Sequence, residues 1–308
     1  MFPALMKFFT ILSSSEWKVI IASLPSSLKL YHVCVFCPSI TNTITGTIAA
    51  DCLHVSKALV DKGWNPAVLN LADEKLAGGW VHGGSRAQEE ELCRRTTLML
   101  SLFPRHSEEY ANLVKTDLSP APHYPMDKDF GGVYSPNITV IRDTIQSQYA
   151  LLDSPYSLAV ISVAAIKNPT INYDTLEIKM PKAIEREKNK MRTILRIGLK
   201  HGRDSLVLGA FGCGAFHTPP SHVARLFAEV FEEPEFKNQY KGLFFAIVEG
   251  KIQEHNPEGN VKPFADIFGE MTLDNIPSPL ENSVVTKMFQ DSVTKKSQSE
   301  SQINCTLI

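Results

Sequence analysis

Glycines and carboxylates are concentrated in one short stretch, AGGWVHGGSRAQEEELCRR, at residues 77–95. Glycine lets the backbone approach a neighbouring group closely, as a bound phosphate requires. A carboxyl group beside such a ligand, partly removed from water, holds its proton more firmly than in solution. A group of this kind can protonate a glycosidic oxygen and then activate a water molecule. If a pyrophosphate lies against these glycines, the stretch therefore favours hydrolysis of a neighbouring glycosidic bond.

A purely structural interpretation exists for the three consecutive glutamates. Acidic residues in the first turn of a helix are favoured by its dipole, and Glu90–Arg94 and Glu91–Arg95 have the spacing of i,i+4 ion pairs. We accept this interpretation for Glu91, which we expect to be a solvated helix residue. It does not explain why a glycine-rich loop precedes Glu89 and Glu90.

Residues 206–216, LVLGAFGCGAF, contain a second glycine loop that follows the end of an apolar strand. A helix is expected to start at 218. Backbone N–H groups beside a helix N-terminus can bind a phosphate without a lysine. The loop has neither the G-K-[ST] of an NTPase loop nor the spacing of a dinucleotide fingerprint. Tight-turn glycines without a ligand remain an alternative, but the first glycine loop favours a phosphate site.

The elements that position these loops alternate in type. Apolar residues at helical spacing predict helices, and short apolar runs predict strands. Helices are expected at 49–63, 88–103, 184–202 and 218–231, the last with Thr218 as N-cap and Pro219 as its first residue. Strands are expected at 65–72, 137–143, 156–166 and 242–250, and residues 204–216 are expected to form a strand followed by the second glycine loop. This alternation predicts a three-layer α/β/α fold with a mixed central sheet.

Composition limits the classes of function. The 308 residues carry a net charge of −2, whereas proteins that grip nucleic acid usually have a strong basic excess, so we expect no sequence-specific nucleic-acid binding. Six cysteines in so long a chain indicate free thiols in a reducing compartment. Cys34 and Cys37 form a lone C-x-x-C in an apolar run, which favours strand thiols over zinc. No metal site and no cofactor is expected.

We divide the chain into an N-terminal extension at 1–44, a catalytic domain at 45–272 and a polar, disordered tail at 273–308. The apolar runs near the N-terminus are too short for a membrane span or a signal peptide, so we expect an intracellular protein, cytoplasmic or nuclear. The chain ends in Cys305-Thr-Leu-Ile, which fits a prenylation motif loosely. Membrane association is expected only if Cys305 is prenylated.

Both glycine loops carry a resemblance to a known family. AGGW, seven further residues and QEE resemble the GGG-x(6–8)-QEE signature of the microbial-type poly(ADP-ribose) glycohydrolases. KHGRDSLVLGAFGCGAFHTPPSHVARLF resembles the family's second signature, and NPAVLNLA and YSPNITVIRD resemble other family segments. The similarity runs from about residue 45 to about 270. It implies a macrodomain fold and exo-type cleavage of the ribose–ribose bond of poly(ADP-ribose), which releases ADP-ribose without a metal.

The resemblance also implies roles for individual residues. Glu90 would be the general acid and base, Glu89 would orient the ribose, and Gln88 would set the start of their helix. Gly78 and Gly79 would let the first loop lie against the distal ribose and phosphate. The diphosphate loop would consist of Gly212, Cys213, Gly214 and Ala215, followed by Phe216 against the ribose. Cys213 would present its N–H, because no base partner for a nucleophile is evident.

Some assignments stay open at this stage. Ala77 stands where the family has its first glycine, and a methyl group there would narrow the ribose site or exclude a positive φ. Asn260 and Phe264 are candidates for adenine contacts. The expected partners are poly(ADP-ribose) or ADP-ribosylated proteins, with ADP-ribose as product. The alternatives are a hydrolase of mono-ADP-ribose on protein or nucleic acid and a non-catalytic ADP-ribose-binding module.

Overall fold

The computed structural model describes residues 17–22, 33–38, 42–103 and 123–279. The chain separates into two units, one of Met1–Asn42 with Leu280–Ile308 and one of Thr43–Pro279. In the first unit, β1 (Trp17–Ala22) and β2 (Val33–Pro38) pair antiparallel, so Cys34 and Cys37 lie in a strand as predicted. The start of the predicted disordered tail is ordered: Ile276 is buried in the second unit, and Trp64 Nε1 donates to Pro277 O at 2.8 Å. Residues 280–308, with Cys305, lie outside the described residues.

The second unit contains a six-stranded mixed sheet in the order β3-β10-β9-β4-β6-β5. Its strands are β3 (Ile44–Ile48), β10 (Gly242–Ala246), β9 (Ser205–Leu208), β4 (Pro66–Leu71), β6 (Leu151–Val163) and β5 (Val133–Arg142). The first five run parallel, and β5 pairs antiparallel with β6 at the edge. This arrangement confirms the predicted mixed central sheet.

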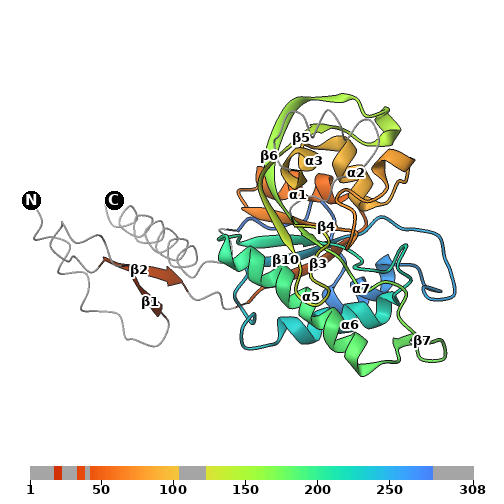
Figure 1. The fold of residues 1–308 in the computed structure, drawn as a ribbon. Helices are drawn as coiled ribbons and strands as arrows, with labels where there is room; N and C mark the ends of the chain where they lie inside the picture. Colours follow the sequence, from red (N-terminus) through yellow and green to blue (C-terminus); the bar gives the residue numbers. More distant parts are fainter. Residues whose placement is uncertain (1–16, 23–32, 39–41, 104–122, 280–308) are drawn as a thin grey trace, which may run out of the picture. The chain divides into compact units, whose positions relative to one another are not determined.

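Helices cover both faces of the sheet (Figure 1). On one face lie α1 (Cys52–Asp61), α2 (Gln88–Arg95) and α3 (Leu98–Leu102), and on the other lie α5 (Pro181–Lys200), α6 (Pro220–Phe231) and α7 (Val261–Phe268). Alternate strand residues supply the two cores: Val68 and Val160 belong to the first, and Leu69 and Ile161 to the second. Central parallel strands are buried on both faces, which explains their nearly unbroken apolar sequences.

Several boundaries differ from the sequence prediction. The helix expected at 88–103 is two helices, because Thr96 is extended, bridges Val140 of β5 and donates its hydroxyl to Leu92 O at 2.7 Å. The helix α6 starts at Pro220 with Pro219 as N-cap, and the buried Thr218 hydroxyl makes no hydrogen bond with the described residues.

The short elements and three of the longer ones were not predicted. The longer ones are β1, β3 and α7. The short ones are the strands β7 (Ile171–Asn172) and β8 (Glu177–Ile178) and the 3₁₀ turns η1 (Val81–Gly83) and η2 (Ile145–Ser147). None of the described helices is long and apolar enough to cross a membrane.

Candidate active site

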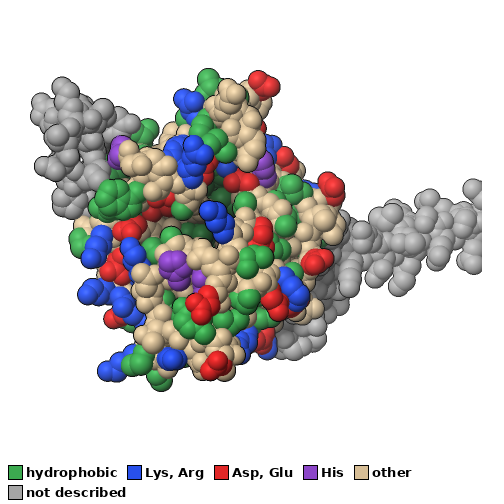
Figure 2. All heavy atoms as spheres, turned by 90° about the vertical axis from the view of Figure 1, so that its right-hand side faces the viewer, with side chains coloured by type: hydrophobic (Ala, Val, Ile, Leu, Met, Phe, Trp, Pro, Cys, Tyr) green, Lys and Arg blue, Asp and Glu red, His purple; other side chains and the backbone are tan. Residues whose placement is uncertain are grey.

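The two glycine loops meet because their strands are neighbours. Strands β4 and β9 pair in parallel, so the loops that follow them leave the same edge of the sheet. A methyl group at Gly209 would lie 3.5 Å from the side chain of Leu71, at the end of β4. The loops after β4 and β10 lie on the right of Figure 1, and Figure 2 shows that this side is hollowed near its middle, with acidic, basic and histidine side chains around it.

Gln88 fastens the start of α2 to the end of β4. Its Oε1 accepts from Leu71 N at 2.8 Å, and its Nε2 donates to Leu69 O at 2.7 Å. A side-chain amide has one acceptor and one donor end, so it can bind both backbone groups at once. Gln88 thus fixes where the next two residues of the helix, Glu89 and Glu90, stand.

Glu89 is 3% exposed and is held from three sides. Its Oε1 accepts from Gly78 N at 3.1 Å and from Asn70 Nδ2 at 3.2 Å, and its Oε2 accepts from Asp73 N at 2.7 Å. Burial raises the pKa of Glu89 to about 8, although these donors oppose the shift. A side chain fixed by three donors is suited to orienting a ligand rather than to moving.

Glu90 is buried beside it but has one uncommitted oxygen. Its Oε1 accepts from Trp80 N at 2.9 Å, whereas Oε2 has no hydrogen-bond partner among the described residues. Buried polar atoms without a partner are uncommon in folded proteins. Oε2 is thus shielded from solvent and left without a hydrogen bond by the described residues.

The first glycine loop is shaped around the two glutamates. Gly78 has φ +76° and Gly79 φ +57°, and a methyl group at Gly79 would lie 2.4 Å from Glu90 Oε1 and 3.0 Å from Glu89 Oε2. At Gly78 it would lie 2.4 Å from Met99 Sδ. The N–H of Gly79 binds Leu76 O at 3.0 Å, so the N–H groups of this loop face the protein and not a phosphate.

The predicted ion pairs of α2 are wrong. Arg94 pairs with Glu91, one turn back at i,i+3, and Tyr149 also donates to Glu91 at 2.7 Å. Arg95 is buried and pairs with Asp51, the N-cap of α1, at 2.8 Å. Glu91 is therefore half-buried and bonded rather than freely solvated. Asp51 lies 44 residues away in sequence, so the helical spacing gave no indication of this partner.

Open backbone N–H groups occur in the second loop. Among the described residues, none accepts from the N–H groups of Gly214, Ala215 or Phe216, and the first two residues are exposed. Gly212 has φ +75°, with the space beside it filled by Ala165 and Thr218. Consecutive N–H groups directed outward from one loop can bind an anion.

Cys213 and Phe216 flank these open groups. Cys213 is buried, and its N–H is bound to Ala210 O at 3.1 Å, so it does not present this N–H as predicted. Burial raises the pKa of its thiol well above the ordinary value, which disfavours the nucleophilic thiolate. Phe216 is half-buried, and Lys167 Nζ lies 5.5 Å from the centre of its ring.

Three residues considered from sequence serve the core or a loop. Phe264 is fully buried between Phe245 and Phe268, so the adenine contact suggested for it is wrong. Asn260 is 7% exposed, and its Oδ1 accepts from Asn256 at 3.1 Å. Ala77 has no positive φ, and its methyl group belongs to the hydrophobic cluster on the α1 face.

Asn70 is a site residue that the sequence prediction missed. It is fully buried, binds Glu89 and donates to Ser162 Oγ at 3.0 Å. The available signal was an asparagine inside the apolar strand NPAVLNLA. The phenol of Tyr124 is buried near Glu89 without a hydrogen-bond partner among the described residues. Its sequence context gave no indication of this position.

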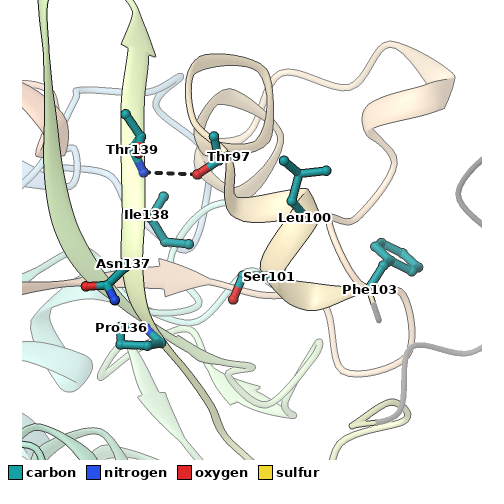
Figure 3. A pocket seen from close by; sticks show the side chains of 8 residues that line it. All are labelled: Thr97, Leu100, Ser101, Phe103, Pro136, Asn137, Ile138 and Thr139. Carbon is teal, nitrogen blue, oxygen red and sulfur yellow. Dashed lines mark hydrogen bonds between the residues drawn. The ribbon is translucent and has the colours of Figure 1, made fainter. Parts of the chain in front are cut away.

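Other features of the described residues lie apart from the glutamates. A cavity of about 550 Å³ lies between α3 and β5 (Figure 3) and contains none of the predicted site residues. Its lining includes Thr97, which accepts from Thr139 N at 3.0 Å. Within the part of the chain that the structure describes, no three His, Cys, Asp or Glu side chains are grouped to hold a metal ion.

Comparison with known proteins agrees with this geometry. Residues 29–143 match the family model of the microbial-type PARG catalytic domain, a range that includes both glutamates. A poly(ADP-ribose) glycohydrolase from Deinococcus radiodurans in complex with ADP-ribose is 26% identical, with a TM-score of 0.56 over 73% of this chain and 83% of that chain. No curated protein sequence matches significantly.

A second organism supplies similar structures. A poly(ADP-ribose) glycohydrolase from Thermomonospora curvata is 25% identical, with a TM-score of 0.57 over 75% of this chain and 79% of that chain. The same protein bound to the inhibitor ADP-HPD has a TM-score of 0.56 at 25% identity, over 74% and 80% of the two chains. The resemblance stated from the two glycine loops is thus confirmed: part of the chain matches the family model, and the fold is similar to that of bacterial poly(ADP-ribose) glycohydrolases.

Proposed function

We propose that the chain is a poly(ADP-ribose) glycohydrolase that releases ADP-ribose from the polymer end. The observation that carries this proposal is the buried carboxyl pair: Glu89 is fixed by three donors, and Glu90 has Oε2 uncommitted. A module that only binds ADP-ribose has no use for two buried carboxyl groups beside a pyrophosphate. Related structures hold ADP-ribose and ADP-HPD, which supports the same ligand class here.

The proposed mechanism divides the work between the two loops. Glu90 Oε2 donates a proton to the glycosidic oxygen as the ribose–ribose bond breaks, and the resulting carboxylate then accepts a proton from the attacking water. Glu89 accepts hydrogen bonds from the ribose hydroxyls. The open N–H groups of residues 214–216 bind the diphosphate, with the ring of Phe216 against the ribose.

The positions of Glu89 and Glu90, and not only their charges, support the roles proposed for them. Glu90 is tied to the loop through one oxygen, so its carboxyl plane is fixed while the other oxygen can exchange a proton. Holding the reacting groups in place contributes much of the rate in reactions of this kind. The clamp formed by Gln88 supplies this placement from the end of β4.

Incubation with poly(ADP-ribose) and with mono-ADP-ribosylated protein, followed by chromatography of released ADP-ribose, tests the proposal. We expect release from the polymer, and a loss of roughly 100- to 10,000-fold in Glu90→Gln. Glu91→Gln is the matched control, because it changes the neighbouring carboxyl that binds Tyr149 and Arg94 instead. Tight binding of ADP-ribose without any release contradicts the proposal, and release only from mono-ADP-ribosylated protein replaces it with the alternative hydrolase.

A further inference from the structure

Trp80 combines an unusual exposure with a position at the catalytic carboxyl. Its N–H holds Glu90, yet its side chain is 63% exposed. A methyl group at Gly83 would lie 3.3 Å from Cε3 of the indole, so the ring rests against the backbone of the same turn. Trp80 thus exposes a large aromatic surface to solvent, while its own backbone N–H binds the carboxyl group assigned to proton transfer.

The turn that carries Trp80 is braced. Its 3₁₀ segment η1 is capped by Gly84, which has φ +82° and donates to Val81 O at 3.3 Å. From α2, the guanidinium of Arg94 donates to Val81 O at 3.3 Å and also to Ser85 O. An exposed ring on a fixed turn loses little conformational entropy when a ligand stacks on it.

Two cationic or potentially cationic side chains lie in the same turn. His82 and Arg86 are exposed, and neither makes a hydrogen bond or ion pair within the described ranges. Most other arginines described have an acidic partner, as Arg94 does with Glu91. An exposed aromatic ring and an exposed, unpaired guanidinium in one loop suit a nucleoside diphosphate, which offers a base for stacking and a diphosphate for ion pairing.

We propose that Trp80 and Arg86 form a subsite for the polymer unit on the leaving side of the cleaved bond. This inference rests on the proposed glycohydrolase function. The oxygen protonated by Glu90 stays on the ribose of the departing unit, and that ribose carries an adenine. Trp80 stacks on this adenine, and Arg86 pairs with the adjoining diphosphate. The subsite would favour the polymer over ADP-ribose attached to a protein side chain.

Binding measurements in a Glu90→Gln background separate this subsite from the ADP-ribose site. Affinities are measured by calorimetry for ADP-ribose and for a purified oligomer of defined length. We expect Trp80→Ala to weaken oligomer binding by about 5- to 100-fold, the range of base–aromatic stacking. The affinity for ADP-ribose should change by no more than about twofold, because the monomer does not reach the subsite and so loses no stacking on Trp80.

Two further variants sharpen the test. Trp80→Phe should retain most oligomer affinity, and Arg86→Gln should weaken oligomer binding and reduce its dependence on salt. Leu151→Ala is the matched control, because Leu151 is an exposed apolar side chain (70%) on β6. It should change neither affinity.

Three results overturn the inference. Equal weakening of both ligands by Trp80→Ala places the ring in the ADP-ribose site itself, and unchanged oligomer binding removes the subsite altogether. Both results leave the proposed function intact if the wild-type chain releases ADP-ribose. Failure of the Glu90→Gln parent to bind either ligand, with no release by the wild type, instead contradicts the proposed function and removes the basis of the subsite.

Discussion

Replacement of Gly79 by alanine tests whether the first glycine loop is shaped by the glutamates. The added methyl group would lie 2.4 Å from Glu90 Oε1, and ordinary contact starts near 3.4 Å. Because the obstacle is the end of a side chain, the carboxyl group can yield by about 1 Å, a displacement that can cost about 100-fold in rate. We therefore expect activity to fall by about that factor.

The accompanying loss of stability should be modest. A left-handed conformation costs a non-glycine residue about 1–2 kcal/mol, and Gly79 has φ +57°. Gly63, at the end of α1, has φ +88° and nothing within 4 Å of the added methyl group. Gly63→Ala therefore carries the strain without the contact, and it is the matched control.

Steady-state cleavage of poly(ADP-ribose) and urea unfolding of both variants decide the matter. The two variants should unfold with similar free energies, while only Gly79→Ala loses activity. Full activity in Gly79→Ala would show that Glu90 needs no such room and would refute the reasoning. Equal losses of activity in both variants would trace the effect to backbone strain.

Three further predictions concern the core, the thiol and pH. Phe264→Ala should destabilise the protein by about 3–5 kcal/mol in thermal unfolding, and ADP-ribose affinity of the folded variant should persist. Cys213→Ala should retain activity in the cleavage assay, because its buried thiol has a raised pKa. Burial raises the pKa of Glu187 to about 8, whereas the unfolded chain releases this proton near 4.5. Between these values Glu187 should lower the free energy of unfolding by about 1.4 kcal/mol per pH unit, and Glu187→Gln should remove this contribution in urea titrations. Glu89, whose pKa is also raised to about 8, contributes a similar fall that stays in the variant. An unchanged slope in that variant would contradict the assignment.

Local sequence patterns were sufficient for most elements. Apolar runs located β4, β6, β9 and β10, because central parallel strands must be apolar on both faces. Helical spacing located α1, α5 and α6. The break at Thr96 could not be foreseen, since it depends on pairing with Val140, which lies 44 residues further along the chain.

The sequence by itself determined that two glycine loops follow two buried strands and that QEE follows the first loop. Only the tertiary structure decided which groups these loops serve. The N–H groups of Gly78 and Trp80 bind the glutamates, whereas those of residues 214–216 stay open. The reason is physical: a backbone N–H binds the acceptor that the packing of distant segments brings to it, and the spacing of glycines does not predict that acceptor.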